Sequence, residues 1–227
     1  TGNGPRTGSF DDKVYGDGVS ESAVHDALVN RTLLKVCRRG KQIWFQFSGE
    51  GPAVLFHFGM TGSFAVKGVP RMQYRSFTVS ENWPPRFTKL ELIFQRIPKS
   101  TQADEGEQES CVSVSFCDPR RLGRILLRHK PEDFPPVSLL APDALNEMPC
   151  VPEFSALLRK SSAPVKVLLL DQNRVVSGIG NWVADEVLYH ARVHPETPGC
   201  DMSDAQLSAL HSAIKHVMLS SALHSAI

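Results

Sequence analysis

The stretch SGIGNWVADE at residues 177–186 decides how the second half of the chain folds. An apolar helical segment precedes it at residues 166–170, two glycines make the turn, and Asn181 opens the next helix. The backbone amides at such a helix start, with the positive end of the helix dipole, form a ready phosphate-binding site. A tight hairpin of two helices is the alternative interpretation. A dinucleotide-binding fingerprint is not indicated, because the turn is short and follows a helix rather than a strand.

Helical patterns continue through the rest of this half. Pro152 and Pro164 can each lie in the first turn of a helix, where a missing N–H costs little. Ser203 and Asp204 cap a last helix, whose apolar residues share one face. Those residues are Leu207, Leu210, Ile214 and Val217.

The first 130 residues have the pattern of a β-rich domain. Short apolar runs, several of which alternate with period two, are separated by Gly and Pro turns, which is typical of an antiparallel sandwich or barrel. One helix is expected at residues 20–30, and a polar, acidic segment at 98–110 is expected to form a loop. The apolar runs lie at residues 33–36, 43–47, 53–58, 90–94 and 112–116.

Together the two halves predict an α+β fold with two domains. We expect an N-terminal antiparallel β-sandwich at residues 1–130 and a helical domain at 153–227. The six prolines at residues 131–152 indicate a linker between them.

The segment HFGMTGSF at residues 57–64 is an apolar strand that ends in a glycine-flanked turn around Met60. A core methionine at a strand end is the ordinary interpretation. The functional interpretation is an apolar wedge of the kind that unstacks and kinks a DNA duplex.

The segment DPRRLGR at residues 118–124 places three arginines around Leu122. A surface turn with solvated charges is the usual meaning of such a run. Arginines and a leucine at a loop tip also suit contact with phosphates and with the void left by an extruded base.

Composition excludes some function classes. The formal charge is +1, so bulk electrostatics argues neither for nor against nucleic acid. Five scattered cysteines without a CxxC pair argue against a disulfide framework and a zinc site, and we predict no metal and no cofactor. No apolar run reaches the roughly 18–20 residues that span a bilayer, so no membrane partner is predicted.

Both ends of the chain are unusual. The start at Thr1 is neither a signal peptide nor a natural initiator, so we expect an interior start. The heptapeptide SALHSAI occurs at residues 208–214 and again at 221–227. The spacing matches no common repeat, which favours an assembly or splicing scar over a genuine helix extension.

The segments at residues 57–64, 118–124 and 177–186, in that order along the chain, closely resemble segments of the formamidopyrimidine-DNA glycosylase and endonuclease VIII family. The chain is most similar to the plant and fungal branch, because DDKV at residues 11–14 and ENWP at 81–84 are also similar to plant sequences. The resemblance runs from about Asp11 to Lys215. It implies a β-sandwich joined to a helix–two-turn–helix domain, with DNA lying across the cleft between them.

The resemblance also implies roles for single residues. Asn181 would contact the DNA backbone beside the lesion, and Lys166 would reach the same phosphates. Met60 would fill the space of the flipped nucleotide, and Arg120 would pair with the orphaned base opposite. Further DNA contacts are expected from Arg121, Leu122 and Lys160, where Leu122 is smaller than the phenylalanine that many members carry.

Lys41 matches a strand lysine that the family uses for proton transfer and phosphate contact; a solvated strand-end lysine is the alternative. The family's nucleophile is the α-amine of an N-terminal proline, which attacks the sugar C1′ and forms a Schiff base, helped by an adjacent glutamate. Neither residue stands at the start of this chain. We therefore expect the first helix of the sandwich domain and normal activity to be missing, and the chain to stop where a C-terminal finger would begin.

The implied function is a bifunctional repair enzyme, a DNA glycosylase with AP lyase activity by β,δ-elimination on oxidised purines and formamidopyrimidines. Its partner would be damaged double-stranded DNA, bound by a monomer in the nucleus or in an organelle. The first alternative is a non-catalytic, damaged-DNA-binding paralogue. The second is an RNA-binding protein, against which Met60 and Arg120 argue.

Overall fold

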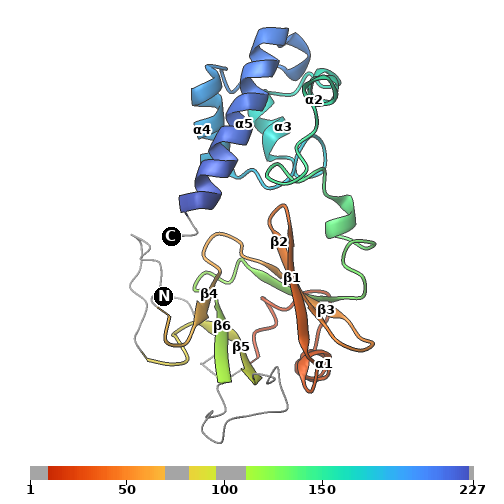
Figure 1. Cartoon of the computed structure of the whole chain (residues 1–227), viewed down its shortest axis with the longest axis vertical. Coiled ribbons are helices and arrows are strands. Elements are labelled where there is room, and N and C mark those ends of the chain that lie inside the picture. The colour runs from red at the N-terminus through yellow and green to blue at the C-terminus, as the bar shows by residue number, and fades with distance from the viewer. Residues whose placement is uncertain (1–9, 70–81, 96–110, 225–227) are drawn as a thin grey trace, which may run out of the picture. The chain divides into compact units, whose positions relative to one another are not determined.

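The computed structural model describes residues 10–69, 82–95 and 111–224, and the chain divides into two compact units (Figure 1). Unit 1 consists of Thr1–Leu34 and Phe45–Arg128, and unit 2 consists of Lys35–Trp44 and His129–Ile227. Unit 1 contains most of the strands and unit 2 contains most of the helices. The predicted α+β class is therefore confirmed.

Seven strands form two sheets in the described part of the chain. The four-stranded sheet has the order β1-β2-β3-β7, and the three-stranded sheet has the order β4-β6-β5. Strand β3 pairs with β7, and β6 pairs with β4 and β5, in each case antiparallel. The strands are β1 (Leu33–Arg39), β2 (Gln42–Phe47), β3 (Ala53–His57), β4 (Ser63–Val66), β5 (Thr88–Gln95), β6 (Cys111–Cys117) and β7 (Arg124–Arg128).

A cluster of phenylalanines packs the two sheets against each other. Phe56 on β3 lies with its ring centroid 5.0 Å from that of Phe64 on β4 and 5.4 Å from that of Phe116 on β6. Phe45 on β2 stacks on Phe64 with ring centroids 5.5 Å apart. Aromatic rings of both sheets thus fill one apolar layer, which is the arrangement of a sandwich. The expected antiparallel β-sandwich is confirmed.

The strand pattern was predicted at five of these positions, but β4 and β7 were not anticipated. Strand β4 has only four residues, too few for a clear alternation, and β7 has only three apolar residues between two arginines. The expected helix is confirmed as α1 (Glu21–Leu28), where the Ser20 hydroxyl accepts the Ala23 N–H at 3.1 Å. The loop expected at residues 98–110 lies outside the described residues.

Unit 2 is built on α2 (Val151–Arg159), α3 (Val165–Leu170), α4 (Asn181–Ala191) and α5 (Asp204–His224), with short 3-10 turns η1 (Val137–Leu139) and η2 (Gly199–Asp201). Helices α2 and α4 pack against α5 (Figure 1). The core includes the four residues expected on the apolar face of α5, which are all buried.

The helix starts agree with the sequence in most places. Asn181 is the first residue of α4, Pro152 lies in the first turn of α2, and the Ser203 hydroxyl accepts the Gln206 N–H at 3.3 Å. Pro164 differs, because it is the cap residue directly before α3 rather than a residue of its first turn.

One hairpin belongs to the helical unit although its strands belong to the sheet. The tip of the β1–β2 hairpin is grouped with unit 2, whereas we expected residues 1–130 to form one domain. Contacts of Arg38 and Gly40 with Asp143 explain this grouping. Across the described ranges, no helix is both long and apolar enough to pass through a bilayer.

Candidate nucleic-acid interface

Two loops of unit 1 are joined through the buried carboxylate of Asp118. Its Oδ1 accepts the hydroxyl of Thr61 at 2.7 Å and the Arg120 N–H at 3.3 Å, and its Oδ2 accepts the Gly123 N–H at 2.6 Å. The loop after β3 and the loop after β6 are therefore held together at one carboxylate.

Gly59 allows the same two loops to approach at the backbone. Its φ is +58°, a left-handed conformation that favours glycine. A Cβ atom at this position would lie 2.6 Å from the carbonyl carbon and oxygen of Leu122, closer than any side chain could be accommodated. The close contact of the two loops therefore depends on glycine at this position.

The paired loops present apolar and basic side chains to solvent. The side chain of Met60 is 73% exposed, and Leu122 and Arg120 are also exposed. Exposed apolar side chains beside an arginine suit insertion into a duplex and contact with its bases. Three residues expected to act together, Met60, Arg120 and Leu122, thus belong to one surface of unit 1.

Arg121 differs from its neighbours because its guanidinium is engaged within the protein. It donates to the carboxylate of Asp11 at 2.6 Å from Nη2 and at 2.9 Å from Nε, and Lys89 Nζ donates to the same carboxylate at 2.7 Å. Burial alone would raise the pKa of Asp11, but hydrogen bonds from Arg121 and Lys89 hold it below its ordinary value. A direct DNA contact by Arg121 stays a prediction.

In unit 2, the turn before α4 is held by the side chain of Gln172. Its amide nitrogen donates to the carbonyls of Leu170 at 2.7 Å and Ile179 at 3.0 Å, and its carbonyl accepts the Gly178 N–H at 2.9 Å. Ile179 is buried in the core, while Asn181 is exposed at the helix start. The first amides of α4 lack acceptors within the helix and can bind an anion.

Lys41 reaches this turn from the β1–β2 hairpin. Its Nζ lies 3.6 Å from where a Cβ atom of Gly180 would stand, so the ammonium lies close to the start of α4. The residue is exposed overall, but desolvation around the ammonium lowers the pKa of Lys41 below its ordinary value. The ammonium thus lies beside the start of α4, and a phosphate contact by Lys41 stays a prediction.

Asp143 fastens the hairpin that carries Lys41. Its buried carboxylate accepts two hydrogen bonds from Arg38, at 2.8 and 2.7 Å, and one from the Gly40 N–H at 2.7 Å. Burial alone would raise the pKa of Asp143, but hydrogen bonds from Arg38 and Gly40 lower it.

The two other predicted lysines differ in their surroundings. Lys166 on α3 forms an ion pair with Asp185 on α4, so its ammonium already has a counter-charge. Lys160, the cap residue of α2, is exposed and makes no ion pair among the described residues.

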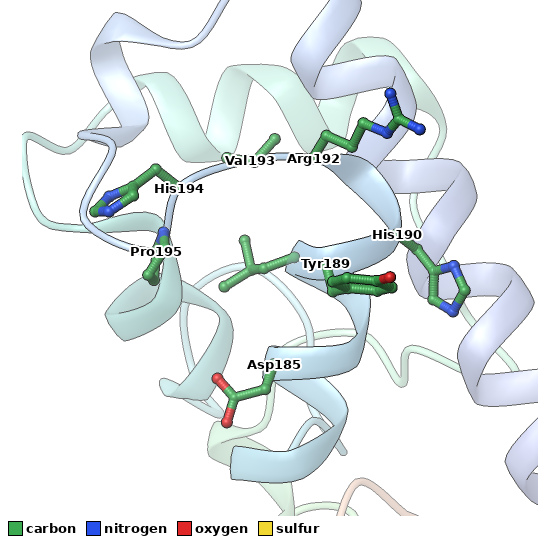
Figure 2. Close-up of a pocket in the computed structure, with 8 residues that line it drawn as sticks. Asp185, Tyr189, His190, Arg192, Val193, His194 and Pro195 are labelled. Atoms are coloured by element: carbon green, nitrogen blue, oxygen red, sulfur yellow. The ribbon is translucent and has the colours of Figure 1, made fainter.

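A shallow pocket of about 680 Å³ lies beside the C-terminal end of α4 (Figure 2). Its lining includes Tyr189, Arg192 and His194, and none of the predicted site residues. It is therefore separate from the turn before α4, which lies at the other end of the helix. Among the residues that the structure describes, no cluster of His, Cys, Asp or Glu has the composition of a metal site.

Comparisons with known proteins agree with this architecture. The family model of the formamidopyrimidine-DNA glycosylase N-terminal domain matches residues 8–125, and that of the formamidopyrimidine-DNA glycosylase H2TH domain matches residues 140–226. Both halves thus match domains of one class of DNA glycosylase. The chain belongs to the formamidopyrimidine-DNA glycosylase family, as its resemblance predicted.

Individual relatives support the same assignment. A formamidopyrimidine-DNA glycosylase of Arabidopsis thaliana is 37% identical over 210 residues, which cover 92% of this chain and 50% of the relative. This match is consistent with the predicted plant-like branch. A formamidopyrimidine-DNA glycosylase of Thermus thermophilus is 32% identical over 190 residues, which cover 83% of this chain and 59% of that protein. The chain therefore spans about half of the curated relatives it matches.

Solved structures share the fold. The Lactococcus lactis Fpg in complex with DNA containing an abasic site has a TM-score of 0.66 at 22% identity, covering 88% of this chain and 64% of that one. The MutM (Fpg) protein of Thermus thermophilus has a TM-score of 0.61 at 30% identity, covering 86% of this chain and 64% of that one.

Sequence reasoning missed the residues that hold the site together. Asp11 and Asp143 pair with cations that are distant in sequence, so no local pattern marks them. Asp118 and Gln172 bind mainly backbone groups close by in sequence. The available signal was limited to Asp118, which stands directly before the arginine-rich turn.

The lowered pKa of Asp143 generates a pH prediction. A carboxylate with a lowered pKa in the folded state stabilises the protein above its unfolded pKa of about 3.9, and this contribution is lost as the pH falls through the folded pKa. Asp143→Asn should therefore unfold more easily at neutral pH, by about 2–4 kcal/mol. Its free energy of unfolding should also change less than that of the wild type below about pH 5.

Urea unfolding at several pH values, followed by circular dichroism, measures both effects. Asp204→Asn is a suitable control, because it removes a carboxylate that is almost fully exposed in its pair with Arg159. Identical pH profiles for wild type and Asp143→Asn would show that this carboxylate does not stabilise unit 2.

Proposed function

We propose that this protein is a base excision repair DNA glycosylase that recognises oxidised purines and formamidopyrimidines in duplex DNA, with associated AP lyase activity. One observation mainly supports the proposal. The buried carboxylate of Asp118 joins the two loops of unit 1 that expose Met60, Arg120 and Leu122. Membership of the glycosylase family, and the relatives solved with damaged DNA, support it.

The exposed side chains fit the tasks that a flipped nucleotide creates. Extrusion of a base leaves a void in the stack and an orphaned base on the other strand. Met60 and Leu122 are apolar and can fill the void, while Arg120 can donate to the acceptors of the orphaned base. Leu122 fills less volume than a phenylalanine, so we expect Met60 to provide most of the wedge contact.

Unit 2 supplies the groups suited to the DNA backbone. The free amides at the start of α4, the exposed Asn181 and the nearby ammonium of Lys41 can bind phosphate oxygens. Lys160 can add a further contact from the end of α2. Lys166 can contribute only if it shares its ammonium with Asp185 or leaves that ion pair.

The covalent chemistry of the proposal follows the family. An α-amine attacks the sugar C1′, the bond from C1′ to the base breaks, and the base leaves with a proton from a general acid. The sugar ring then opens at the C1′–O4′ bond, with O4′ taking a proton, and the resulting Schiff base allows β,δ-elimination of the phosphates. A non-catalytic protein that binds damaged DNA is the second candidate, because it requires the same loops and no nucleophile.

Damage-specific binding is the first test. The 227-residue protein should bind a duplex with a tetrahydrofuran abasic analogue more tightly than the undamaged duplex in fluorescence anisotropy. Met60→Ala should reduce this preference by about three- to tenfold, because the wedge loses its apolar side chain. The matched control is Ile93→Ala, which truncates a 67% exposed side chain on β5 of the same unit. Equal affinity for abasic duplex, undamaged duplex and structured RNA would overturn the proposal.

Lys41 gives a second prediction, on salt and pH. Lys41→Met should weaken binding to all duplexes and reduce the slope of log affinity against log salt by about one. Because its pKa is lowered, Lys41 should lose its charge before an ordinary lysine does as the pH rises. As the pH rises toward the ordinary lysine pKa of about 10.4, wild-type affinity should therefore fall more than that of Lys41→Arg, since arginine stays charged. Parallel pH profiles would exclude Lys41 from the phosphate site.

Trapping with borohydride tests the chemistry separately from binding. The proposed lyase chemistry passes through a Schiff base between an amine of the protein and the sugar C1′, which borohydride reduces to a stable bond. A covalent adduct of protein and abasic DNA on a denaturing gel would support the glycosylase and lyase proposal. Damage-specific binding without such an adduct would instead favour the non-catalytic candidate.

A further inference from the structure

We propose that Asp11, with Lys89, holds Arg121 and thereby sets the shape of the loop that reads the base opposite a lesion. In this arrangement Arg121 is a positioning residue, whereas its two neighbours Arg120 and Leu122 meet the DNA. The inference rests on the proposed function, and it replaces the expected DNA contact of Arg121 by a contact within the protein.

The contact is a buried ion cluster and not a surface pair. The Asp11 side chain is 2% exposed, that of Lys89 is 7% exposed and that of Arg121 is 19% exposed. Arg121 makes three hydrogen bonds to the carboxylate, from 2.6 to 3.1 Å, and Lys89 makes a fourth at 2.7 Å. Charge-assisted, bidentate contacts of this kind fix geometry as well as contributing binding energy.

The neighbouring acid shows what a surface contact would look like. Asp12 is 90% exposed, and its carboxylate lies 4.0 Å from the guanidinium of Arg121, at the limit of an ion pair. The two acids are adjacent in sequence and carry the same charge. Only Asp11 is placed to orient the arginine.

Asp11 is itself fixed to the sheet that carries the loop. The segment that follows it joins β7, because the Ile125 N–H donates to the Val14 carbonyl at 2.8 Å and the Gly16 N–H donates to the Ile125 carbonyl at 3.1 Å. The Tyr15 hydroxyl donates to the Lys89 carbonyl at 2.8 Å. The carboxylate is thus a rigid support, since both its segment and Lys89 are anchored.

The backbone of the loop needs such a support. Arg121 has a φ of +56°, a left-handed conformation that is unfavourable for a residue with a side chain. Asp118 binds the backbone on both sides of it, at Arg120 and Gly123. The side chain of Arg121 therefore points to Asp11 while the residues before and after it remain exposed.

Loss of the carboxylate should change selectivity more than overall affinity. Without Asp11, the two cations of Arg121 and Lys89 would face each other with no counter-charge, and the loop would leave its left-handed conformation. Arg120 would then lose its alignment with the orphaned base, while contacts with phosphates elsewhere would remain. The ratio of affinities for different opposite bases is the quantity that reports this alignment.

The test uses the 227-residue protein and duplexes with a tetrahydrofuran abasic analogue opposite dC or dA. Arg120→Ala should remove the preference between the two duplexes, a loss of roughly tenfold. Asp11→Asn should lower the same ratio toward that of Arg120→Ala. Asp12→Asn is the matched control, since it removes an equal charge next door, and it should keep the wild-type ratio.

Two further variants separate positioning from stability and from direct contact. Val24→Ala lowers the stability of unit 1 by removing buried methyl groups away from the loop. It should keep the wild-type ratio of affinities for the two duplexes, because the loop itself is unchanged. Arg121→Ala should lower the ratio while leaving the salt slope of binding as in the wild type. A salt slope reduced by about one would instead show that Arg121 contacts a phosphate, and would overturn the inference.

The outcomes also distinguish this inference from the proposed function. If Arg120→Ala abolishes the preference between the two duplexes and Asp11→Asn preserves it, only the positioning role of Asp11 is wrong. Equal binding to both duplexes by the wild type and by Arg120→Ala would remove the base-reading role of the loop, and the inference would fail with it.

Discussion

A carboxylate inside a protein must be saturated with hydrogen bonds or cations, because its charge is otherwise too costly to remove from water. Three carboxylates among the described residues meet that requirement, and each binds a loop or hairpin of the candidate interface. Asp118 joins the two loops of unit 1, Asp11 holds Arg121, and Asp143 fastens the hairpin of Lys41. The exposed groups owe their positions to buried charges beneath them.

This constraint explains which parts of the site could be predicted from sequence. The start of α4 depends on local features, two glycines followed by an amphipathic segment, and Asn181 lies where the pattern placed it. For Met60 the ordinary interpretation, a core methionine, is wrong, because the residue is 73% exposed. Asp11 and Asp143 could not be predicted in the same way, because their donors are distant; Asp11 and Arg121 are 110 residues apart and Arg38 and Asp143 are 105 apart.

Counting cations in a motif overestimates those available to a ligand. The arginine-rich turn and the helical segment before α4 each contain a cation that pairs within the protein, Arg121 with Asp11 and Lys166 with Asp185. Pairing of this kind depends on tertiary packing, which periodicity and composition do not report. Arg120 lies in the same turn as Arg121, and Lys160 precedes Lys166 in the same half of the chain. The difference between cations paired within the protein and exposed cations appears only when burial and partners are known.

The contact of Gly59 with the backbone of Leu122 has a kinetic consequence. The two loops lie close at their main chains, with no side chain between them at Gly59. We therefore expect them to enter a DNA duplex together and not one after the other. In the proposed function, void filling by Met60 and contact of Arg120 with the opposite base should therefore occur in one concerted step. Recognition of a base pair by this surface would then be all-or-none. No intermediate would form in which the base stack is opened but the opposite base is not yet contacted.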